Sequence, residues 1–351
     1  MTVKDFSKIF NPTSIVGYKE MKGETIAIDA SIVIISTSSM QYQTKLANAN
    51  GEPTQHIRSV FSNIVASVKY GVNTIWCFDS RSRRDNKDST LAIKNVDNRI
   101  LLRKKQEQDI KQLNDDIEES IKLVSNLSIE QINEIDPNYY DMLNDKRAEL
   151  EKIRLRNPNI KTFNKNTEDV MFMLTKLGIP YTHAPPGVEA EELGAYLCKL
   201  DKADGVMTTD PDALAFGAKY ILKKIPKKSG KYHKYILDKC IEETKTMDNF
   251  IKVCVACGTD YNKKIPRVGP KTVIRKILNG TALDEEQTKA VERYKHELTF
   301  EPTITLHEVT KTSISELAKW LIDVQGFNSV KVYKDLSVFG YGNTESSYDD
   351  H

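Results

Sequence analysis

PGVEAEEL at residues 186–193 and GVMTTDPD at residues 205–212 are the two segments that decide how this chain folds. A proline–glycine pair followed by acids is typical of a helix start, because the helix dipole favours negative charge in the first turn. Glu189 and Glu191 are two residues apart, so a regular helix would not place them on one face. They can converge only at the N-terminal turn, which is where the sequence puts them.

The second segment reads as a strand that ends in two aspartates, Asp210 and Asp212. In an extended chain, residues two apart point to the same side. With the two glutamates they would gather four carboxylates, which resist joint ionisation unless a counter-ion is present. Hard divalent cations that take oxygen ligands are the natural counter-ions. One Glu-x-Glu pair is more often a solvated surface feature, so the metal hypothesis depends on further acids.

Two earlier segments supply such acids. Residues 25–31 and 73–80 are short β-branched apolar runs, which predict buried strands, and the helical pattern at about residues 56–70 indicates a parallel βαβ unit. Ligands of open α/β sheets bind at the carboxyl ends of the strands. Asp29 and Asp79 end these strands and are expected at that edge, although an aspartate after a strand is more commonly a turn or a helix cap.

The composition, with 39% hydrophobic and 28% charged residues, indicates a globular chain with a polar surface. Its length of 351 residues predicts one large domain with appendages. The five cysteines are widely spread, and the CxxC pair Cys254 and Cys257 lies in an apolar run, which favours buried thiols over zinc or redox chemistry. We therefore expect an intracellular, reducing compartment, and we find no signal peptide or membrane-spanning stretch.

The net charge of +2 conceals three basic segments. Residues 81–111 hold ten Lys/Arg against five Asp/Glu, residues 219–239 hold eight lysines against one aspartate, and residues 261–280 hold six Lys/Arg and no acid. A charge run is usually only a solvated face. Basic segments beside clustered carboxylates, however, indicate a polyanion brought to a metal site.

Between the two halves of the α/β pattern, residues 81–166 are highly charged and have little β pattern. They predict two helices, at about residues 96–124 and 139–156, joined by a linker at residues 125–138. Such a pair is expected to project from the core as a hairpin or arch. The alternative is a surface insertion with a structural or partner-binding role.

The α/β pattern then resumes with a helix at residues 168–177 and a strand at residues 178–181. A helix through residues 250–257 ends at Gly258, a helix-stop residue, and Asp260 supplies a seventh carboxylate. Further segments predict a basic hairpin around Ser229-Gly230, with strands at residues 219–222 and 235–237. A glycine–proline turn at residues 265–272 would suit a phosphate and is followed by a helix to residue 278. A last helix is predicted at residues 313–324.

The order of these motifs resembles the flap endonuclease/XPG family of structure-specific 5′ nucleases. The resemblance covers about residues 20–335, and the motifs that carry it are AIDAS at 27–31, GEPTQH at 51–56, FD at 78–79, EAE at 189–191, DPD at 210–212, GTDY at 258–261 and VGPK at 268–271.

The resemblance implies a PIN-like α/β fold, in which a twisted, mainly parallel sheet is flanked by helices and carries a helical arch and a helix–two-turn–helix DNA-binding element. The expected parts are the N-terminal part of the nuclease core at 1–80, the arch at 81–166, the second part of the core at 167–260, the helix–two-turn–helix with C-terminal helices at 261–335, and a polar tail at 336–351.

The resemblance also implies an Mg²⁺-dependent DNA nuclease, acting as endonuclease and 5′–3′ exonuclease on flap or branched DNA, with two metal ions that Mn²⁺ would replace. It implies a monomer in the nucleus or at another site of DNA replication. Its metal-binding and catalytic acids would be Asp29, Asp79, Glu189, Glu191, Asp210, Asp212 and Asp260. Lys87 and Lys94 would steer the scissile phosphate, with Arg84 and Arg99 as alternatives for this role. DNA would be bound by Arg84, Arg99, Arg103, Arg267, Gly269, Lys271 and Thr272.

Five features depart from the family pattern. The chain begins Met1-Thr2-Val3 and not Met-Gly, Arg267 stands where glycine is usual, and Ile35 replaces an aromatic residue that would stack on a base. The arch is longer than is typical. The tail shows no clear sliding-clamp motif.

Three alternatives remain open. A DNA-junction scaffold that lost catalysis would not need to keep all seven acids. A 5′–3′ exoribonuclease of related fold would meet different phosphate spacing in A-form RNA, which the helix–two-turn–helix does not favour. A glycosyltransferase that uses Asp210-Pro211-Asp212 would leave Asp29 and Asp79 unexplained.

Overall fold

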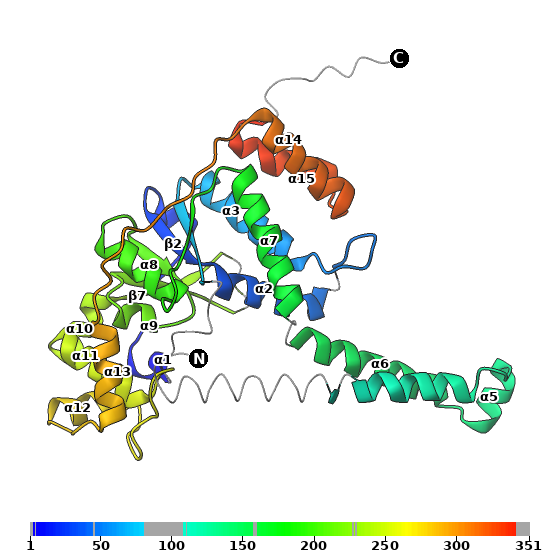
Figure 1. The fold of residues 1–351 in the computed structure, drawn as a ribbon, viewed down its shortest axis with the longest axis horizontal. Coiled ribbons are helices and arrows are strands. Elements are labelled where there is room, and N and C mark those ends of the chain that lie inside the picture. The colour runs from blue at the N-terminus through cyan, green and yellow to red at the C-terminus, as the bar shows by residue number, and fades with distance from the viewer. Residues whose placement is uncertain are drawn as a thin grey trace.

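The structure is a computed structural model that describes residues 3, 5–44, 46–80, 108–109, 111–156, 160–226, 228 and 230–341, with backbone alone for residues 38–44, 151–156 and 160–163. Figure 1 shows a body built around a sheet, with a helical arm projecting from one side. Within the described ranges, none of the helices combines the length and the apolar character that crossing a bilayer requires.

Seven strands of the described chain form one sheet in the order β1-β7-β6-β5-β2-β3-β4. The five strands β6, β5, β2, β3 and β4 pair in parallel. β7 pairs antiparallel with β6, and β1 pairs antiparallel with β7. The predicted α/β fold with a mainly parallel sheet is confirmed. The strands are β1 Ser14–Val16, β2 Thr25–Asp29, β3 Asn73–Phe78, β4 Tyr181–His183, β5 Gly205–Met207, β6 Tyr220–Lys224 and β7 Tyr232–Ile236.

Helices cover both faces of the sheet because the central strands bury side chains on both sides. Ala27 of β2 and Val206 of β5 belong to one apolar core, whereas Ile26 and Ile28 of β2 belong to the other. The first core is completed by α1 Phe6–Ile9, α8 Ala190–Lys199, α9 Asp212–Ala215, α10 Leu237–Thr244, α11 Met247–Cys257, α12 Val273–Leu278 and α13 Glu285–Lys295. The second is completed by α2 Ala30–Thr44, α3 Gln55–Lys69, α7 Ile160–Lys176, α14 Lys311–Lys319 with the π-helical turn Trp320–Val324, and α15 Ser329–Leu336.

The helical arm consists of the helix at residues 111–123 with α5 Ile129–Ile135 and α6 Tyr139–Arg156. It projects away from the body (Figure 1). The linker predicted at residues 125–138 contains a helix of its own, α5. Ser128 accepts a hydrogen bond from the Gln131 amide, and the Gln131 side chain accepts one from the Ser128 amide, which makes a capping box at the start of α5.

The arm has a small apolar core of its own. Side chains from its three helices are buried against one another and form a cluster separate from the two cores of the body. Its buried members are Ile117, Ile132, Tyr139, Leu143 and Leu150. Residues 81–107 lie outside the described part of the chain, and they include the start of the first predicted arm helix.

Two boundaries differ from those expected. The helix predicted at residues 168–177 begins earlier, at Ile160 of α7, and the strand predicted at residues 178–181 begins later, at Tyr181 of β4. Gly178 has a left-handed φ of +61° and reverses the chain directly after α7. Pro180 has no amide hydrogen to donate to a neighbouring strand, so regular pairing starts after it.

Other local expectations are confirmed. β6 and β7 form the predicted hairpin, and α11 ends at Gly258, whose φ is +86°. All five cysteines fall within the described residues as free, buried thiols, so the CxxC pair on α11 is part of the core and not a disulfide.

Candidate active site

The acids Asp29 and Asp79 lie at the carboxyl edge of neighbouring parallel strands, since Asp29 ends β2 and Asp79 directly follows β3. The Thr208 hydroxyl donates to Asp29 Oδ2 at 2.9 Å, and the Ser31 hydroxyl donates to Asp79 Oδ2 at 2.5 Å. Asp79 Oδ1 accepts the backbone amide of Ala190 at 3.0 Å, which ties the end of β3 to the start of α8. The strand order reverses beside β2, so these acids lie where open α/β sheets bind ligands.

The paired glutamates lie at the start of α8, as the sequence predicts. Glu189 is the N-cap residue and has an extended backbone, and Glu191 lies in the first turn. The helix can approach the sheet closely because Gly194 has no side chain. A Cβ at this position would lie 3.1 Å from Val206 Cγ1 and 3.4 Å from Ala27 Cβ. The close packing holds the acidic end of α8 against β2 and β5.

The prediction that Asp210 and Asp212 share an extended strand is wrong. β5 ends at Met207, and Asp212 is the first residue of the short helix α9. Pro211, with a φ of −68°, is suited to a helix start and cannot donate to a strand. The Asp212 amide donates to Asp210 Oδ1 at 3.0 Å. A turn closed by this hydrogen bond therefore brings the two aspartates together.

Asp260 comes from a loop that follows α11. Gly258 ends that helix, and the Thr259 hydroxyl donates to Asn262 Oδ1 at 2.7 Å, which fixes the loop from within. The Asn262 amide group donates to the backbone oxygen of Val255 at 2.7 Å and ties the loop back to α11. Asp260 is buried, with 8% of its surface exposed.

The seven carboxylates influence one another electrostatically. Burial raises the pKa of Glu191 well above its usual value, and the charges of its neighbours raise it further; these are Glu189, Asp29, Asp210 and Asp79. Burial also raises the pKa of Asp210, with a further contribution from Asp212. Burial raises the pKa of Asp212 to about 6, where a hydrogen bond from Tyr294 opposes the rise and the charge of Asp260 adds to it.

The oxygen-only donor set fits a hard divalent cation. Among the residues that the structure describes, no group of three or more acid, histidine or cysteine side chains has the geometry of a ready-made metal cage. Mg²⁺ does not require such a cage, because it usually keeps several waters and takes one or two carboxylates directly. Burial and mutual repulsion both raise these pKa values, and a bound cation would relieve the repulsion.

Sequence reasoning missed two residues that contact these acids and a third that pairs with the neighbouring Glu192. The Tyr261 hydroxyl donates to Glu189 Oε2 at 3.2 Å, and the Tyr294 hydroxyl donates to Asp212 Oδ2 at 2.7 Å. Arg293 pairs with Glu192, which is 2% exposed. A signal for α13 was present in the sequence, since Asp284 and Gln287 form a capping box ahead of an amphipathic helix.

The predicted phosphate-binding turn is formed by residues 265–272. Arg267 and Lys271 are exposed, and Arg267 has a left-handed φ of +62°. α12 begins only at Val273, and the amides of Thr272 and Val273 both donate to the Gly269 carbonyl. These two amides are therefore paired within the turn.

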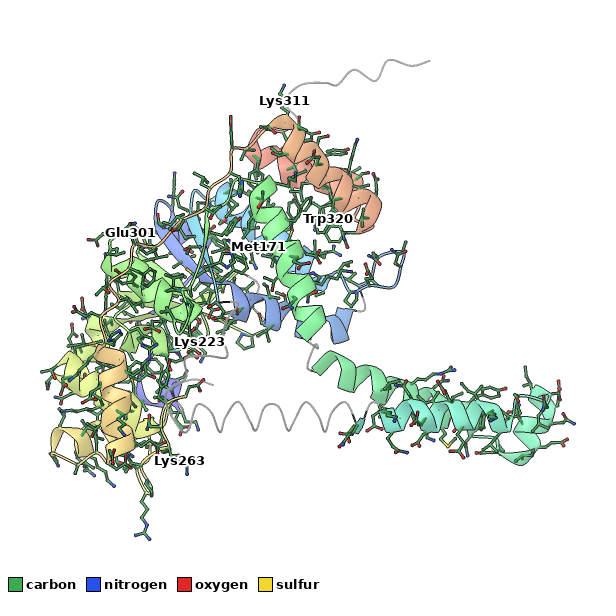
Figure 2. The ribbon with its side chains drawn as sticks, in the orientation of Figure 1. Met171, Lys223, Lys263, Glu301, Lys311 and Trp320 are labelled. Carbon is green, nitrogen blue, oxygen red and sulfur yellow. The ribbon has the colours of Figure 1, made fainter. Side chains whose placement is uncertain are left out.

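The turn lies at the end of the body opposite α14. Lys263, which precedes the turn, and Lys311, which begins α14, mark these two ends (Figure 2). The remaining predicted phosphate-binding residues lie outside the described part of the chain, so their roles stay predictions; these are Arg84, Lys87, Lys94, Arg99 and Arg103.

Ile35, which replaces an aromatic residue in the resemblance, lies on α2 directly beyond the acidic edge. It is 45% exposed, so an aliphatic side chain is presented where stacking on a base was expected. At the N-terminus, the Val3 amide donates to Asp212 Oδ1 at 3.1 Å, so this end of the chain reaches the acids.

Family models and related proteins that match this chain agree on one family. The XPG N-terminal domain model matches residues 1–100 and the XPG I-region model matches residues 178–260, together more than half of the chain. Flap endonuclease 1-A of Sorghum bicolor is 26% identical over 377 aligned positions, which cover 99% of this chain and 88% of that protein. Flap endonuclease 1-A of Xenopus laevis is 27% identical, with 86% of this chain and 72% of that protein covered.

Solved structures show the same fold. Flap endonuclease-1 from Methanococcus jannaschii superimposes with a TM-score of 0.64 at 18% identity, covering 96% of this chain and 97% of that one. Human GEN1 in complex with Holliday junction DNA gives a TM-score of 0.58 at 15% identity, covering 96% of this chain and 76% of that one. With both XPG models matched in order and the acids at the sheet edge, the chain belongs to the flap endonuclease/XPG family.

Proposed function

We propose that the chain is an Mg²⁺-dependent, structure-specific DNA endonuclease and 5′–3′ exonuclease that hydrolyses phosphodiesters at 5′ flaps or branched DNA during replication, repair or recombination. The observation that carries the proposal is the gathering of seven interacting carboxylates, from five separate segments, at the carboxyl edge of a parallel sheet. The names of the relatives support it, since those matched over most of this chain are flap endonucleases.

The proposed division of labour follows the positions of the acids. One metal ion would be held by Asp29 and Asp79 with the paired glutamates, and a second by Asp210, Asp212 and Asp260. Two such ions, when bound, supply an activated water and stabilise the leaving oxygen of an in-line displacement. The chain itself holds the acids in place, through the Ser31 and Thr208 hydroxyls and through the turn that joins Asp210 to Asp212.

The direct test is cleavage of matched flap, nicked, gapped and single-stranded substrates, each as DNA and as RNA, with and without Mg²⁺. We expect cutting of flap DNA in Mg²⁺ and none in EDTA, because the acids need a cation to act on a phosphodiester. Binding of flap DNA without cleavage in any metal would identify a scaffold. Preference for RNA ends would identify an exoribonuclease.

We further propose that the turn at residues 265–272 grips duplex DNA several nucleotides from the cut. Lys271→Ala should remove about one phosphate contact and reduce the salt dependence of binding by nearly one unit of slope. Gly269→Val should block the approach of a phosphate to the backbone. The protein alone has space there, because no atom lies within 4 Å of a Cβ built on Gly269.

The measurement is the affinity of both variants for duplex-armed and single-stranded DNA across a salt series. Lys311→Ala is a matched control, since Lys311 is exposed and lies at the opposite end of the body (Figure 2). The loss should be large on the duplex arm and small on the single strand, which does not reach the turn. Equal losses on the two substrates would show that the turn only stabilises the fold.

The cellular setting is also a proposal. Five buried free thiols are consistent with a reducing compartment, and a role on branched DNA would place the protein in the nucleus or at another site of DNA replication. We propose that it acts there as a monomer.

A further inference from the structure

Helix α13 carries two neighbouring residues that contact acids on two different elements. Consecutive helical residues diverge by about 100°, so one helix can reach in two directions. Tyr294 contacts Asp212 at the start of α9, and Arg293 contacts Glu192 in the first turn of α8. α13 lies at residues 285–295, far in sequence from both partners, and it packs against α11.

The Tyr294 contact is fully enclosed. The side chain is 2% exposed, and its hydroxyl donates to Asp212 Oδ2 at 2.7 Å. Its ring packs against the rings of Phe216, at 4.8 Å between centroids, and Tyr261, at 5.6 Å. A buried tyrosine hydroxyl needs a partner, and here the partner is a carboxylate of the proposed metal site.

The Arg293 contact fixes the α8 side of the site. Its guanidinium forms a two-pronged ion pair with the buried Glu192 carboxylate, with Nη1 donating to Oε1 at 2.6 Å and Nη2 donating to Oε2. The same guanidinium stacks over Phe216 at 5.2 Å and over Tyr261 at 5.5 Å. Because Glu192 directly follows Glu191, the pair fixes the turn of α8 that carries the paired glutamates.

Tyr261 joins the two contacts. Its hydroxyl donates to Glu189 Oε2 at 3.2 Å, while its ring neighbours both the guanidinium of Arg293 and the ring of Tyr294. The acids of α8 and α9 are therefore held in relation to each other by one aromatic and guanidinium cluster. Groups that orient metal ligands in this way commonly change metal affinity by about 10–100-fold when removed.

We propose that Arg293 and Tyr294 are positioning residues that set the metal affinity of the carboxylate site by fixing α8 and α9 relative to each other. The proposal rests on the proposed function, because it takes the acids to be metal ligands. Neither residue is required to touch the metal or the DNA.

The test is Mn²⁺ binding to the full chain without DNA, measured by electron paramagnetic resonance, for the wild type and Tyr294→Phe. The variant keeps the ring and its stacking but loses the hydroxyl. We expect about tenfold weaker binding of at least one Mn²⁺. Tyr196→Phe is the matched control, because that hydroxyl donates to the Phe300 carbonyl at 2.9 Å and touches no acid of the site. Its Mn²⁺ affinity should equal that of the wild type.

A second pair of variants separates positioning from folding. Arg293→Lys keeps the charge but loses the two-pronged pair, and Glu192→Gln removes the same pair from the other side. Both substitutions should weaken Mn²⁺ binding. The double variant should bind Mn²⁺ as tightly as the single variant with the lower affinity, because the two residues act as a unit. In cleavage assays these variants should need more Mg²⁺ for half-maximal rate but approach the wild-type rate at saturation.

The outcomes also separate this inference from the proposed function. Wild-type Mn²⁺ affinity in Tyr294→Phe and Arg293→Lys, with the wild-type protein cutting flap DNA, would overturn the positioning role and leave the nuclease proposal standing. A wild-type protein that binds no Mn²⁺ would overturn both. A loss of rate that saturating Mg²⁺ does not restore would also contradict positioning through metal affinity.

Discussion

Asp210→Ala should abolish the cleavage of flap DNA. Its affinity for that DNA should stay within about tenfold of the wild type, a difference of about 1.4 kcal/mol in binding free energy. The residue lies between the two groups of acids, since its charge acts on Glu191 and it shares a turn with Asp212. Removing it takes away a proposed metal ligand. The phosphate contacts that dominate DNA affinity are proposed to lie elsewhere, so binding should survive.

The measurement is single-turnover cleavage together with equilibrium binding in Ca²⁺. Asp210→Asn keeps an acceptor for the Asp212 amide and removes only the charge, so it should be as inactive as the alanine variant. Asp323→Ala deletes an exposed aspartate beyond α14 and should cut normally. Near-normal turnover by the purified Asp210→Ala protein in Mg²⁺ would overturn the metal assignment.

Gly258→Ala should lower the free energy of unfolding by at least about 3 kcal/mol. The residue has φ +86° and ψ 130°, a conformation that side chains oppose. A Cβ would lie 2.8 Å from the Lys264 amide nitrogen and 3.1 Å from its Cα. These are backbone atoms held by the loop that carries Asp260, so they cannot move aside as a flexible side chain would.

Urea unfolding monitored by circular dichroism measures this loss. Gly269→Ala is the matched control, because its Cβ would meet no atom within 4 Å, and its stability should change by less than about 0.5 kcal/mol. If both variants unfold at the same urea concentration, the loop after α11 relaxes more easily than its geometry implies.

The sequence was informative where chemistry and local structure coincide. Asp29 and Asp79 follow short apolar runs, and an apolar run that ends in an acid predicts both a strand and its working edge. Glu189 and Glu191 could converge only at a helix start, and that is where they lie. The sequence also predicted that α11 ends at Gly258, because a residue with positive φ after a helix is a local requirement that glycine meets.

The errors arose where a local pattern allowed two structures. A two-residue spacing suits an extended strand, but Pro211 and the hydrogen bond from the Asp212 amide to Asp210 convert that segment into a turn and a helix start. The linker of the arm ends in Asp136-Pro137, a turn signal, and the sequence pattern did not indicate the short helix α5 that ends just before it.

Other features depend on contacts that no local pattern encodes. Tyr294 and Asp212 are 82 residues apart, and Arg293 and Glu192 are 101 apart. The spacing of apolar residues shows that α13 is amphipathic, but it does not show which element the buried face of α13 contacts. Such pairings follow from the tertiary packing of α8, α9, α11 and α13 around one aromatic cluster.

The separate apolar core of the helical arm has a consequence for how this chain tolerates changes in length. The arm enters between β3 and α7, and its buried side chains, such as Ile132 and Leu143, pack against one another and not against the sheet. Insertions or deletions at its far end would alter contacts within the arm, and the far end takes no part in the pairing of β3 with β4. We therefore expect the far end of the arm to accept a shorter or longer hairpin without changes to the acidic edge.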